Sequence, residues 1–101
     1  MNPRDHRAYN SLGVLYEIEK DFRKAKQSYE KAIDLNPNIG TYYNNLAIIL
    51  KKQENYREAE KNVLKAIELE DENPVFYTNY GEILLLSGNI ILAEIMLLYA
   101  I

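Results

Sequence analysis

The sequence predicts an all-α protein of about six helices, stacked as antiparallel pairs in a single domain, residues 1–101. Three observations predict this fold: a repeat of 34 residues, apolar residues at helical spacing inside each repeat, and helix-breaking residues between the apolar segments. A fixed period of this length is typical of units that each bury one face against the next. We therefore expect a short stacked array with no deep enzyme cleft.

The period is visible in seven columns, a column being the residues at the same place in successive repeats. Columns of large apolar residues alternate with columns of Gly and Ala, as expected where paired helices approach closely and larger side chains fill the space beside them. The columns are Tyr9, Tyr43 and Tyr77; Leu12, Leu46 and Tyr80; Gly13, Ala47 and Gly81; Phe22, Tyr56 and Ile90; Ala25, Ala59 and Ala93; Tyr29, Val63 and Leu97; Ala32, Ala66 and Ala100. They define repeats at about residues 6–39, 40–73 and 74–101, with the third shortened at its end.

Apolar residues inside each repeat recur at steps of three and four, which marks one face of a helix. The expected helices lie near residues 5–19, 22–35, 39–53, 56–70, 74–87 and 90–101. Asp21, Asn55 and Asn89 should cap the second helix of each pair, because their side chains can accept bonds from free backbone N–H groups. Pro37 and Pro74 separate the repeats, since proline prevents a helix from simply continuing.

These columns resemble the tetratricopeptide repeat (TPR) over nearly the whole chain. That family's pattern of aromatic, Leu-Gly, Tyr, then Ala, aromatic, Ala and Pro is carried here by Tyr9, Leu12, Gly13, Tyr16, Ala25, Tyr29, Ala32 and Pro37. The departures are small: Leu50 and Leu84 replace the tyrosine of the first repeat, Ala47 replaces Gly, and Pro74 comes late. The resemblance implies a right-handed superhelical stack, an α-solenoid, that binds other proteins and has no enzymatic activity.

The composition of the chain excludes several classes of function. A net charge of −3 and a pI near 5.2 remove the positive field on which nucleic-acid binding usually depends. The chain has no cysteine, so it can form no disulfide or thiolate metal site, which fits a reducing compartment. Its first ten residues, MNPRDHRAYN, carry charges where a signal peptide needs an apolar stretch. We therefore expect a cytoplasmic protein that binds no nucleic acid.

The sequence offers no catalytic constellation. His6 is the only histidine and lies at the N-terminal edge, without a second histidine or a cysteine to complete a metal-ligand set. The acidic residues lie in charged, polar runs rather than in the apolar surroundings that would keep one acid neutral. No phosphate-binding or nucleophile motif is present. We predict no catalytic residue, no cofactor and no metal, and we keep Tyr42, which falls outside the columns, as a groove or edge contact.

The first helix of each repeat is expected to line the concave side of the stack, the usual binding surface of such proteins. The face should present Arg7, Asn10, Ser11, Val14, Glu17, Ile18; Thr41, Asn44, Asn45, Ile48, Lys51, Lys52; Val75, Thr78, Asn79, Glu82, Leu85 and Leu86. Within it, the predicted partner-binding groove consists of Asn10, Ser11, Asn44, Asn45, Ile48, Thr78 and Asn79. An exposed Asn offers both a donor and an acceptor, so a ladder of them suits an extended peptide.

The column of Ser11, Asn45 and Asn79 resembles the asparagine ladder in the repeat region of the nucleocytoplasmic transferases that attach N-acetylglucosamine to Ser and Thr. Asn45 and Asn79 match that ladder and Ser11 departs from it. The alternative is a solvated helix face that needs no ligand.

A second family device, the carboxylate clamp for the acidic C-terminal tails of heat-shock chaperones, is predicted to be absent. The residues aligned with its five positions are Asn10, Val14, Asn45, Val75 and Asn79, of which one matches. We therefore expect no preference for a free acidic C-terminus.

The last 12 residues, IILAEIMLLYAI, contain one polar residue, Glu94. Outward positions that are mostly polar in the first two repeats are occupied here by Ile91, Leu92, Ile95, Met96, Leu98 and Tyr99. A membrane span is the weakest explanation, because 12 helical residues rise about 18 Å against a hydrocarbon core of about 30 Å. A longer array cut before its next repeat is a second explanation. Outward apolarity favours a homodimer or other homo-oligomer through the C-terminal helix, or a dedicated partner, whether the interface is natural or engineered.

The sequence thus predicts a scaffold that binds a peptide or partner protein in the concave groove and also associates through its C-terminal helix. The alternative is a structural, self-assembling module with no separate peptide ligand.

Overall fold

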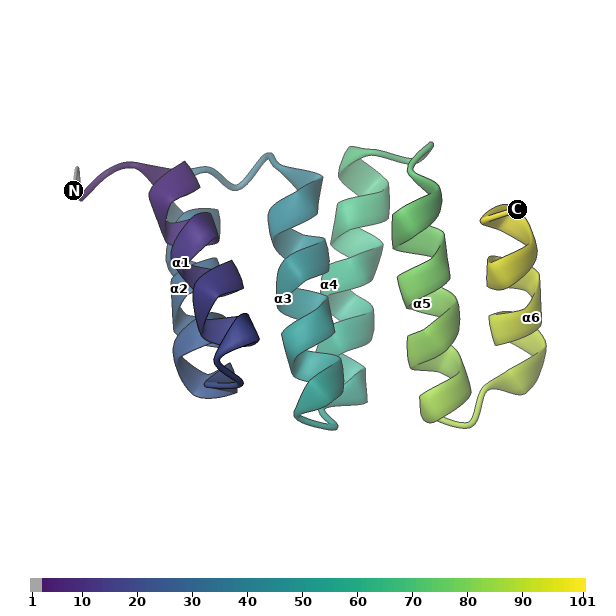
Figure 1. Ribbon diagram of the computed structural model, residues 1–101. Helices are drawn as coiled ribbons and strands as arrows, with labels where there is room; N and C mark the ends of the chain where they lie inside the picture. The colour runs from purple at the N-terminus through teal and green to yellow at the C-terminus, as the bar shows by residue number, and fades with distance from the viewer. Residues whose placement is uncertain (1–2) are drawn as a thin grey trace.

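The computed structural model describes residues 3–101, which form six α-helices and, within that range, no strand. The helices are α1 (His6–Ile18), α2 (Phe22–Leu35), α3 (Gly40–Lys52), α4 (Tyr56–Leu69), α5 (Pro74–Leu86) and α6 (Ile90–Tyr99). They form three antiparallel pairs that follow one another along a single stack (Figure 1). Both the predicted fold class and the six predicted helices are confirmed, with bounds that differ by two residues at most.

The second helix of each pair begins at the predicted cap. The side-chain oxygen of Asp21 accepts a bond from the Lys24 amide at 3.2 Å, and Asn55 and Asn89 accept equivalent bonds at 3.5 and 3.4 Å. Asp5 and Asn73, which were not among the predicted caps, cap α1 and α5 in the same way. Five of the six helices thus begin at a repeated local signal, a capping Asp or Asn, and α3 alone begins without a side-chain cap.

Each turn inside a pair contains one residue in the left-handed region: Lys20 with φ 62°, Glu54 with φ 63° and Gly88 with φ 92°. The capping residue follows directly, and its backbone N–H returns to the preceding helix, as from Asp21 to the Tyr16 carbonyl at 2.9 Å. Glycine adopts this conformation without steric cost, whereas Lys and Glu do not. The three turns therefore share one geometry but carry unequal strain.

Small residues bring the two helices of a pair together. A Cβ placed on Gly13 would lie 2.4 Å from the ring of Tyr29, and one on Gly81 would lie 2.6 Å from Cγ of Leu97. The middle repeat has Ala47 in this column, opposite the smaller Val63. The small columns of the sequence thus mark close helix contacts, as expected.

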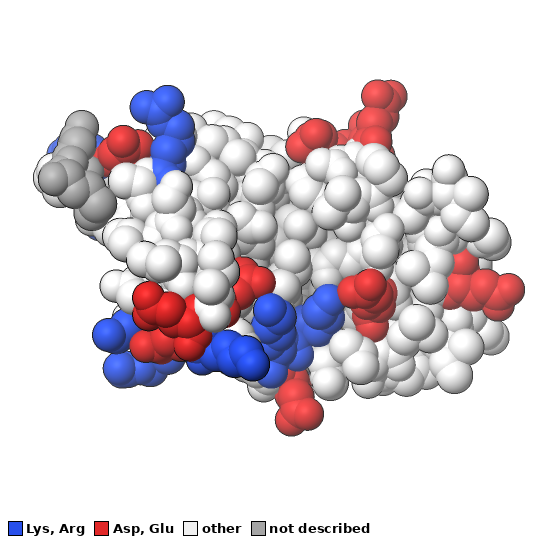
Figure 2. All heavy atoms as spheres, in the orientation of Figure 1, with Lys and Arg blue, Asp and Glu red and all other residues white. Residues whose placement is uncertain are grey.

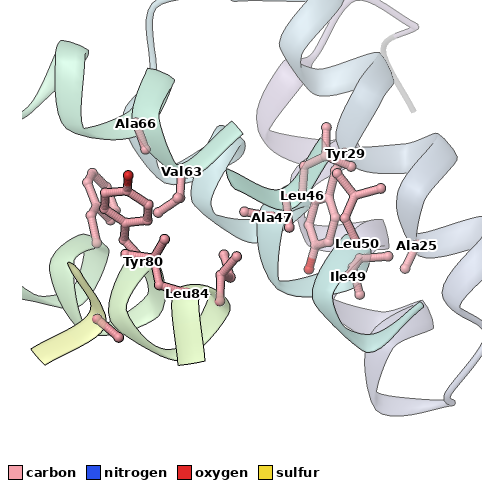
Figure 3. Packing of buried hydrophobic residues seen from close by; sticks show 14 residues of the cluster. Ala25, Tyr29, Leu46, Ala47, Ile49, Leu50, Val63, Ala66, Tyr80 and Leu84 are labelled. Carbon is pink, nitrogen blue, oxygen red and sulfur yellow. The ribbon is translucent and has the colours of Figure 1, made fainter. Parts of the chain in front are cut away.

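The core continues from one repeat to the next. Tyr29 of α2 lies among Leu46, Ile49 and Leu50 of α3, and Val63 of α4 lies beside Tyr80 and Leu84 of α5 (Figure 3). Along the stack, α2 packs on α3 and α4 packs on α5, with a smaller contact between α3 and α5. Each helix therefore contacts its neighbours and little else.

Tyr42 is a boundary residue, so its assignment to the groove or edge is wrong. Its side chain is buried, and its hydroxyl lies 2.6 Å from Nδ1 of His6. The two rings are 5.7 Å apart, and Nε2 of His6 lies 3.5 Å from the side-chain nitrogen of Asn36. These contacts join the N-terminus of α1 to α3.

Within residues 3–101, no helix combines the length and the apolar character that crossing a bilayer would require.

Candidate partner-binding surfaces

The helices α1, α3 and α5 form one face of the stack, and charged side chains cross its two repeat boundaries. Nζ of Lys52 lies 3.1 Å from Glu17, and Nζ of Lys51 lies 2.8 Å from Glu82. Lys51 also donates to Oδ1 of Asn79 at 3.2 Å. Figure 2 shows acidic and basic side chains next to one another across the lower part of this face. Both lysines are therefore partly neutralised by their neighbours.

The asparagines of this face bond to one another across the repeat boundaries. Nδ2 of Asn45 donates to Oδ1 of Asn10 at 3.0 Å, and Nδ2 of Asn79 donates to Oδ1 of Asn44 at 2.9 Å. Each bond joins one column to the neighbouring column of the next repeat, 35 residues away. The ladder is therefore part of the contact between repeats.

The two asparagine pairs differ in how deeply they are buried. Asn44 and Asn79 are 4% and 5% exposed, so the expectation that their amides are exposed is wrong. Asn10 and Asn45 are half-buried, and each amide keeps a hydrogen-bonding group that their mutual bond does not use. Ser11 is exposed, and Thr78 is half-buried with its hydroxyl donating to the Pro74 carbonyl at 3.0 Å. Peptide binding by Asn44 and Asn79 remains a prediction that requires their bond to open.

A hollow of about 260 Å³ lies between α3 and α5 on this face. Its lining consists of Ile48, Lys51, Val75, Thr78, Asn79 and Glu82. Three of these, Ile48, Thr78 and Asn79, belong to the predicted groove, and the hollow brings them together. The other three lie on the concave face predicted from the sequence but were not singled out. Their columns are mixed in type, so the period alone gave no signal for them.

The hollow combines apolar side chains with charge. Val75 is exposed and Ile48 is half-buried, while Lys51 and Glu82 form their ion pair within the same lining. Such a site can hold an apolar side chain of an extended segment and offer polar groups to the backbone beside it.

The outer side of α6 is the second candidate surface. Ile91, Leu98 and Tyr99 are 78%, 62% and 68% exposed, and Ile95 is also exposed. Tyr99 stacks on Tyr77 of α5 with ring centroids 5.7 Å apart. A shallow hollow of about 220 Å³ is lined by Ile95, Leu98 and Tyr99. This part of the stack shows few charged side chains in Figure 2.

Two predicted members of this surface lie elsewhere. Leu92 and Met96 are half-buried and pack against the hydrophobic core, so their outward placement is wrong. They fall on the side of α6 that turns towards the core. The pattern of polar and apolar residues could not reveal this, because Glu94 is the one polar residue among the last 12.

Two tyrosines have perturbed hydroxyl groups. Burial, together with a bond from Oη of Tyr29 to Glu17 at 2.9 Å, raises the pKa of Tyr29. Burial and the nearby Glu60 carboxylate, 3.3 Å from its hydroxyl, raise the pKa of Tyr80. Both hydroxyls serve contacts between helices.

Among residues 3–101, no group of three or more His, Cys, Asp or Glu side chains is placed to hold a metal ion.

Comparison with known sequences gives a consistent result. Sequence profiles described as tetratricopeptide repeat match residues 6–39 and 28–61. The human RANBP2-like and GRIP domain-containing proteins 1 and 2 are each 47% identical to this chain over 34 residues. That segment is 34% of this chain and 2% of either relative, so the chain matches a very small part of these proteins.

Solved structures resemble almost the whole chain. The TPR2B domain of yeast Sti1, in a complex with pHsp70, has a TM-score of 0.92 at 23% identity and covers 94% of this chain and 76% of its own. The first and second TPR of Spaghetti (RPAP3), each bound to the HSP90 peptide SRMEEVD, have TM-scores of 0.93 and 0.92 at 16% and 20% identity. They cover 99% and 98% of this chain, and 79% and 92% of their own. At these identities the likeness concerns the fold.

Proposed function

Because the chain belongs to the tetratricopeptide repeat family, whose fold is a protein-interaction scaffold, we propose that it holds an extended segment of a partner protein in the groove formed by α1, α3 and α5. The observation that carries the proposal is the hollow between α3 and α5, where Ile48 and Val75 lie beside the Lys51–Glu82 pair. We propose no catalytic activity for the chain itself. With no cysteine in its sequence, it suits a reducing compartment, and we propose the cytoplasm.

The groove favours a segment with an apolar side chain over a free acidic terminus. Val14 and Val75 stand at two positions where the carboxylate clamp would need polar or basic groups. The lysines that are present already pair with Glu17 and Glu82, so binding a carboxylate would require those pairs to break. The two Spaghetti structures, which share the fold, hold the HSP90 peptide SRMEEVD. We propose that this chain discriminates against such tails.

The test is to pan a library of random 12-residue peptides on the chain and to measure the affinity of retained peptides by calorimetry. Val75→Glu should weaken a retained peptide at least tenfold, because it places a carboxylate in the hollow beside Glu82. Thr41→Glu is the matched control: it lies in the same column and is exposed, but it does not line the hollow. Equal effects of both variants, or no retained peptide, would overturn the proposal.

The pair Asn45→Ala and Asn79→Ala is a poorer test, because these amides also join the repeats. A loss of peptide binding in that variant would not separate a missing ligand contact from a loosened stack. Val75 is exposed and makes no such bond.

A second function, self-association through the outer side of α6, is supported by the exposure of Ile91, Ile95, Leu98 and Tyr99. A two-fold contact would let this one surface cover itself in a homodimer. If this surface is the contact between copies, sedimentation at micromolar concentration shows a dimer that does not grow further, and Ile91→Lys or Ile95→Glu dissociates it while helix content is retained. A dimer unaffected by both substitutions would reject this surface and leave the peptide groove untouched.

A further inference from the structure

The first observation concerns the N-terminal end of the stack, where a face that is buried elsewhere lies open. In α3, Ile49 lies beside Tyr29 of the preceding repeat and is 0% exposed (Figure 3), and its column mate Ile83 in α5 is equally buried. The α1 member of this column is Leu15, which is 47% exposed. Leu12, one turn earlier in α1, is half-buried, whereas its column mate Leu46 is buried. The apolar stripe by which α3 and α5 dock is therefore also present on α1, where no other helix of residues 3–101 covers it.

The C-terminal end leaves the complementary face open. Val63 of α4 is buried at the second boundary and Ile67 is half-buried, both on the core of the stack. Their column mates at the end of the chain are Leu97, which is half-buried, and Ile101, which is fully exposed. A hollow of about 240 Å³ remains here, lined by Leu85, Ile90, Glu94, Leu97, Leu98 and Ile101. Its lining residues are column mates of second-repeat residues that face the third repeat. The hollow therefore lies where a following helix would pack, as α5 packs on α4.

The groove-side residues distinguish the ends from the internal boundaries. Inside the stack, the boundary between α3 and α5 is joined by Lys51 and Glu82. The column mates of these two residues at the open ends are Leu85 at the C-terminal end and Val14 at the N-terminal end, and both are exposed. An ion pair is thus replaced by two apolar residues.

The other boundary repeats this exchange. Between α1 and α3 it is joined by Glu17 and Lys52. The corresponding residues at the ends are Leu85 again and Ile18, which is also exposed. The positions change from charged to apolar on both sides together, so each open end matches the other.

We infer that the two open ends are the two halves of one interface: the C-terminal end of one copy receives α1 of a second copy, as α4 receives α5 within the chain. In this arrangement Leu85 of one copy meets Val14 and Ile18 of the next. The contact is heterologous, so it joins copies head to tail instead of closing a two-fold dimer.

Glu94 is the one charged residue in the lining of the C-terminal hollow. Its column mates already lie at the internal boundaries: Lys26 is half-buried at the first, and Glu60 accepts a bond from the hydroxyl of Tyr80 at the second. The column therefore accommodates a charge beside a docked helix.

This head-to-tail contact is distinct from peptide binding in the groove. It also differs from the two-fold contact through the outer side of α6, because it is formed by residues of α1 and α5.

The decisive experiment blocks one end at a time. Leu15→Glu with Ile18→Glu blocks the N-terminal end, and Leu85→Glu with Ile101→Glu blocks the C-terminal end. By sedimentation, the unmodified chain should grow in mass beyond a dimer as concentration rises, and each blocked variant should be a monomer. An equimolar mixture of the two variants should form a complex of one copy of each, because one intact end of each kind remains.

A mixture that stays monomeric, or an unmodified chain that never exceeds a dimer, would overturn the inference. Ile91→Glu, on the outer side of α6, is the matched control and should leave head-to-tail growth unchanged. If this variant alone dissociates the assembly, the head-to-tail contact is rejected in favour of the two-fold contact. If the doubly substituted N-terminal variant loses helix content, Val14→Glu replaces it, since the third repeat carries Glu82 at that place and folds with it. Peptide affinity measured on the blocked monomers separates this outcome from that of the proposed groove.

Discussion

The boundary between α4 and α5 and the open end formed by α5 and α6 use the same columns of the repeat, yet one is buried and the other is not. At the boundary, Val63 is buried and Ile67 is half-buried; at the end, their column mates Leu97 and Ile101 are half-buried and fully exposed. The residue type in a column therefore does not determine its burial. What determines it is whether a following helix is present, as expected for a structure in which each unit relies on the next.

The comparison also separates packing from specificity. Apolar residues line the boundaries and the ends alike, but the ion pairs and asparagine bonds between repeats occur at the internal boundaries. Directional bonds fix the register of one repeat on the next at a small gain in stability. Four predictions test this division.

The largest effect should come from shortening a boundary residue and its column mate at the free end. Ile83→Ala should lower the free energy of unfolding by about 2–5 kcal/mol, because it leaves a cavity in a fully buried place. Leu15→Ala should cost less than about 1 kcal/mol, since solvent already reaches that side chain. Urea denaturation measures both, and similar costs would mean that Leu15 is covered in solution.

Next in size is the contact inside the first helix pair. Gly13→Ala should destabilise the fold by about 1–3 kcal/mol, because the new methyl group would meet the buried ring of Tyr29 at 2.4 Å. Combining it with Tyr29→Val reproduces the pairing of Ala47 with Val63 in the middle repeat. The double variant should lose less than the sum of the single losses, and strict additivity would show that the two sites are independent.

The third effect appears at alkaline pH. The pKa of Tyr29 is raised in the folded chain, so above a pH of about 10 the unfolded chain loses this proton first and stability falls as pH rises, until the folded pKa is reached. The slope is at most about 1.4 kcal/mol per pH unit for this tyrosine. Tyr29→Phe should reduce the loss measured between pH 10 and 11, while costing about 1 kcal/mol at neutral pH through the lost Glu17 bond.

The smallest effect should come from the ion pair in the groove. Lys51→Met should cost below about 1 kcal/mol, because the gain from pairing with half-exposed Glu82 is offset by desolvation of the lysine. Removing both charges should reveal a coupling of about 0.5 kcal/mol that fades in high salt. A coupling that persists in 1 M salt would contradict this assignment.

The sequence was sufficient for the fold because three of its signals agree. The 34-residue columns, the capping Asp21, Asn55 and Asn89, and the prolines between repeats each placed helix ends within two residues of those observed. Helix bounds depend on local chemistry, which the chain repeats three times.

The contacts between repeats were harder to predict. Asn45 bonds to Asn10 and Asn79 bonds to Asn44 because the helices of successive repeats meet with an offset of one residue from the period. A column shows which residues share a face but not which residue of the next repeat they contact. For the same reason, burial of Asn79 and Tyr42 could not be read from their positions on a polar or mixed face.

The helices contact their sequence neighbours and little beyond them, and this has a consequence for dynamics. Opening of one terminal hairpin removes a single inter-repeat boundary and leaves the other intact, so backbone amides of α6 should exchange with solvent sooner than those of α3. A ligand lying in the hollow between α3 and α5 would touch two repeats at once. Its binding would tie their unfolding together and make a chain of loosely coupled units more cooperative.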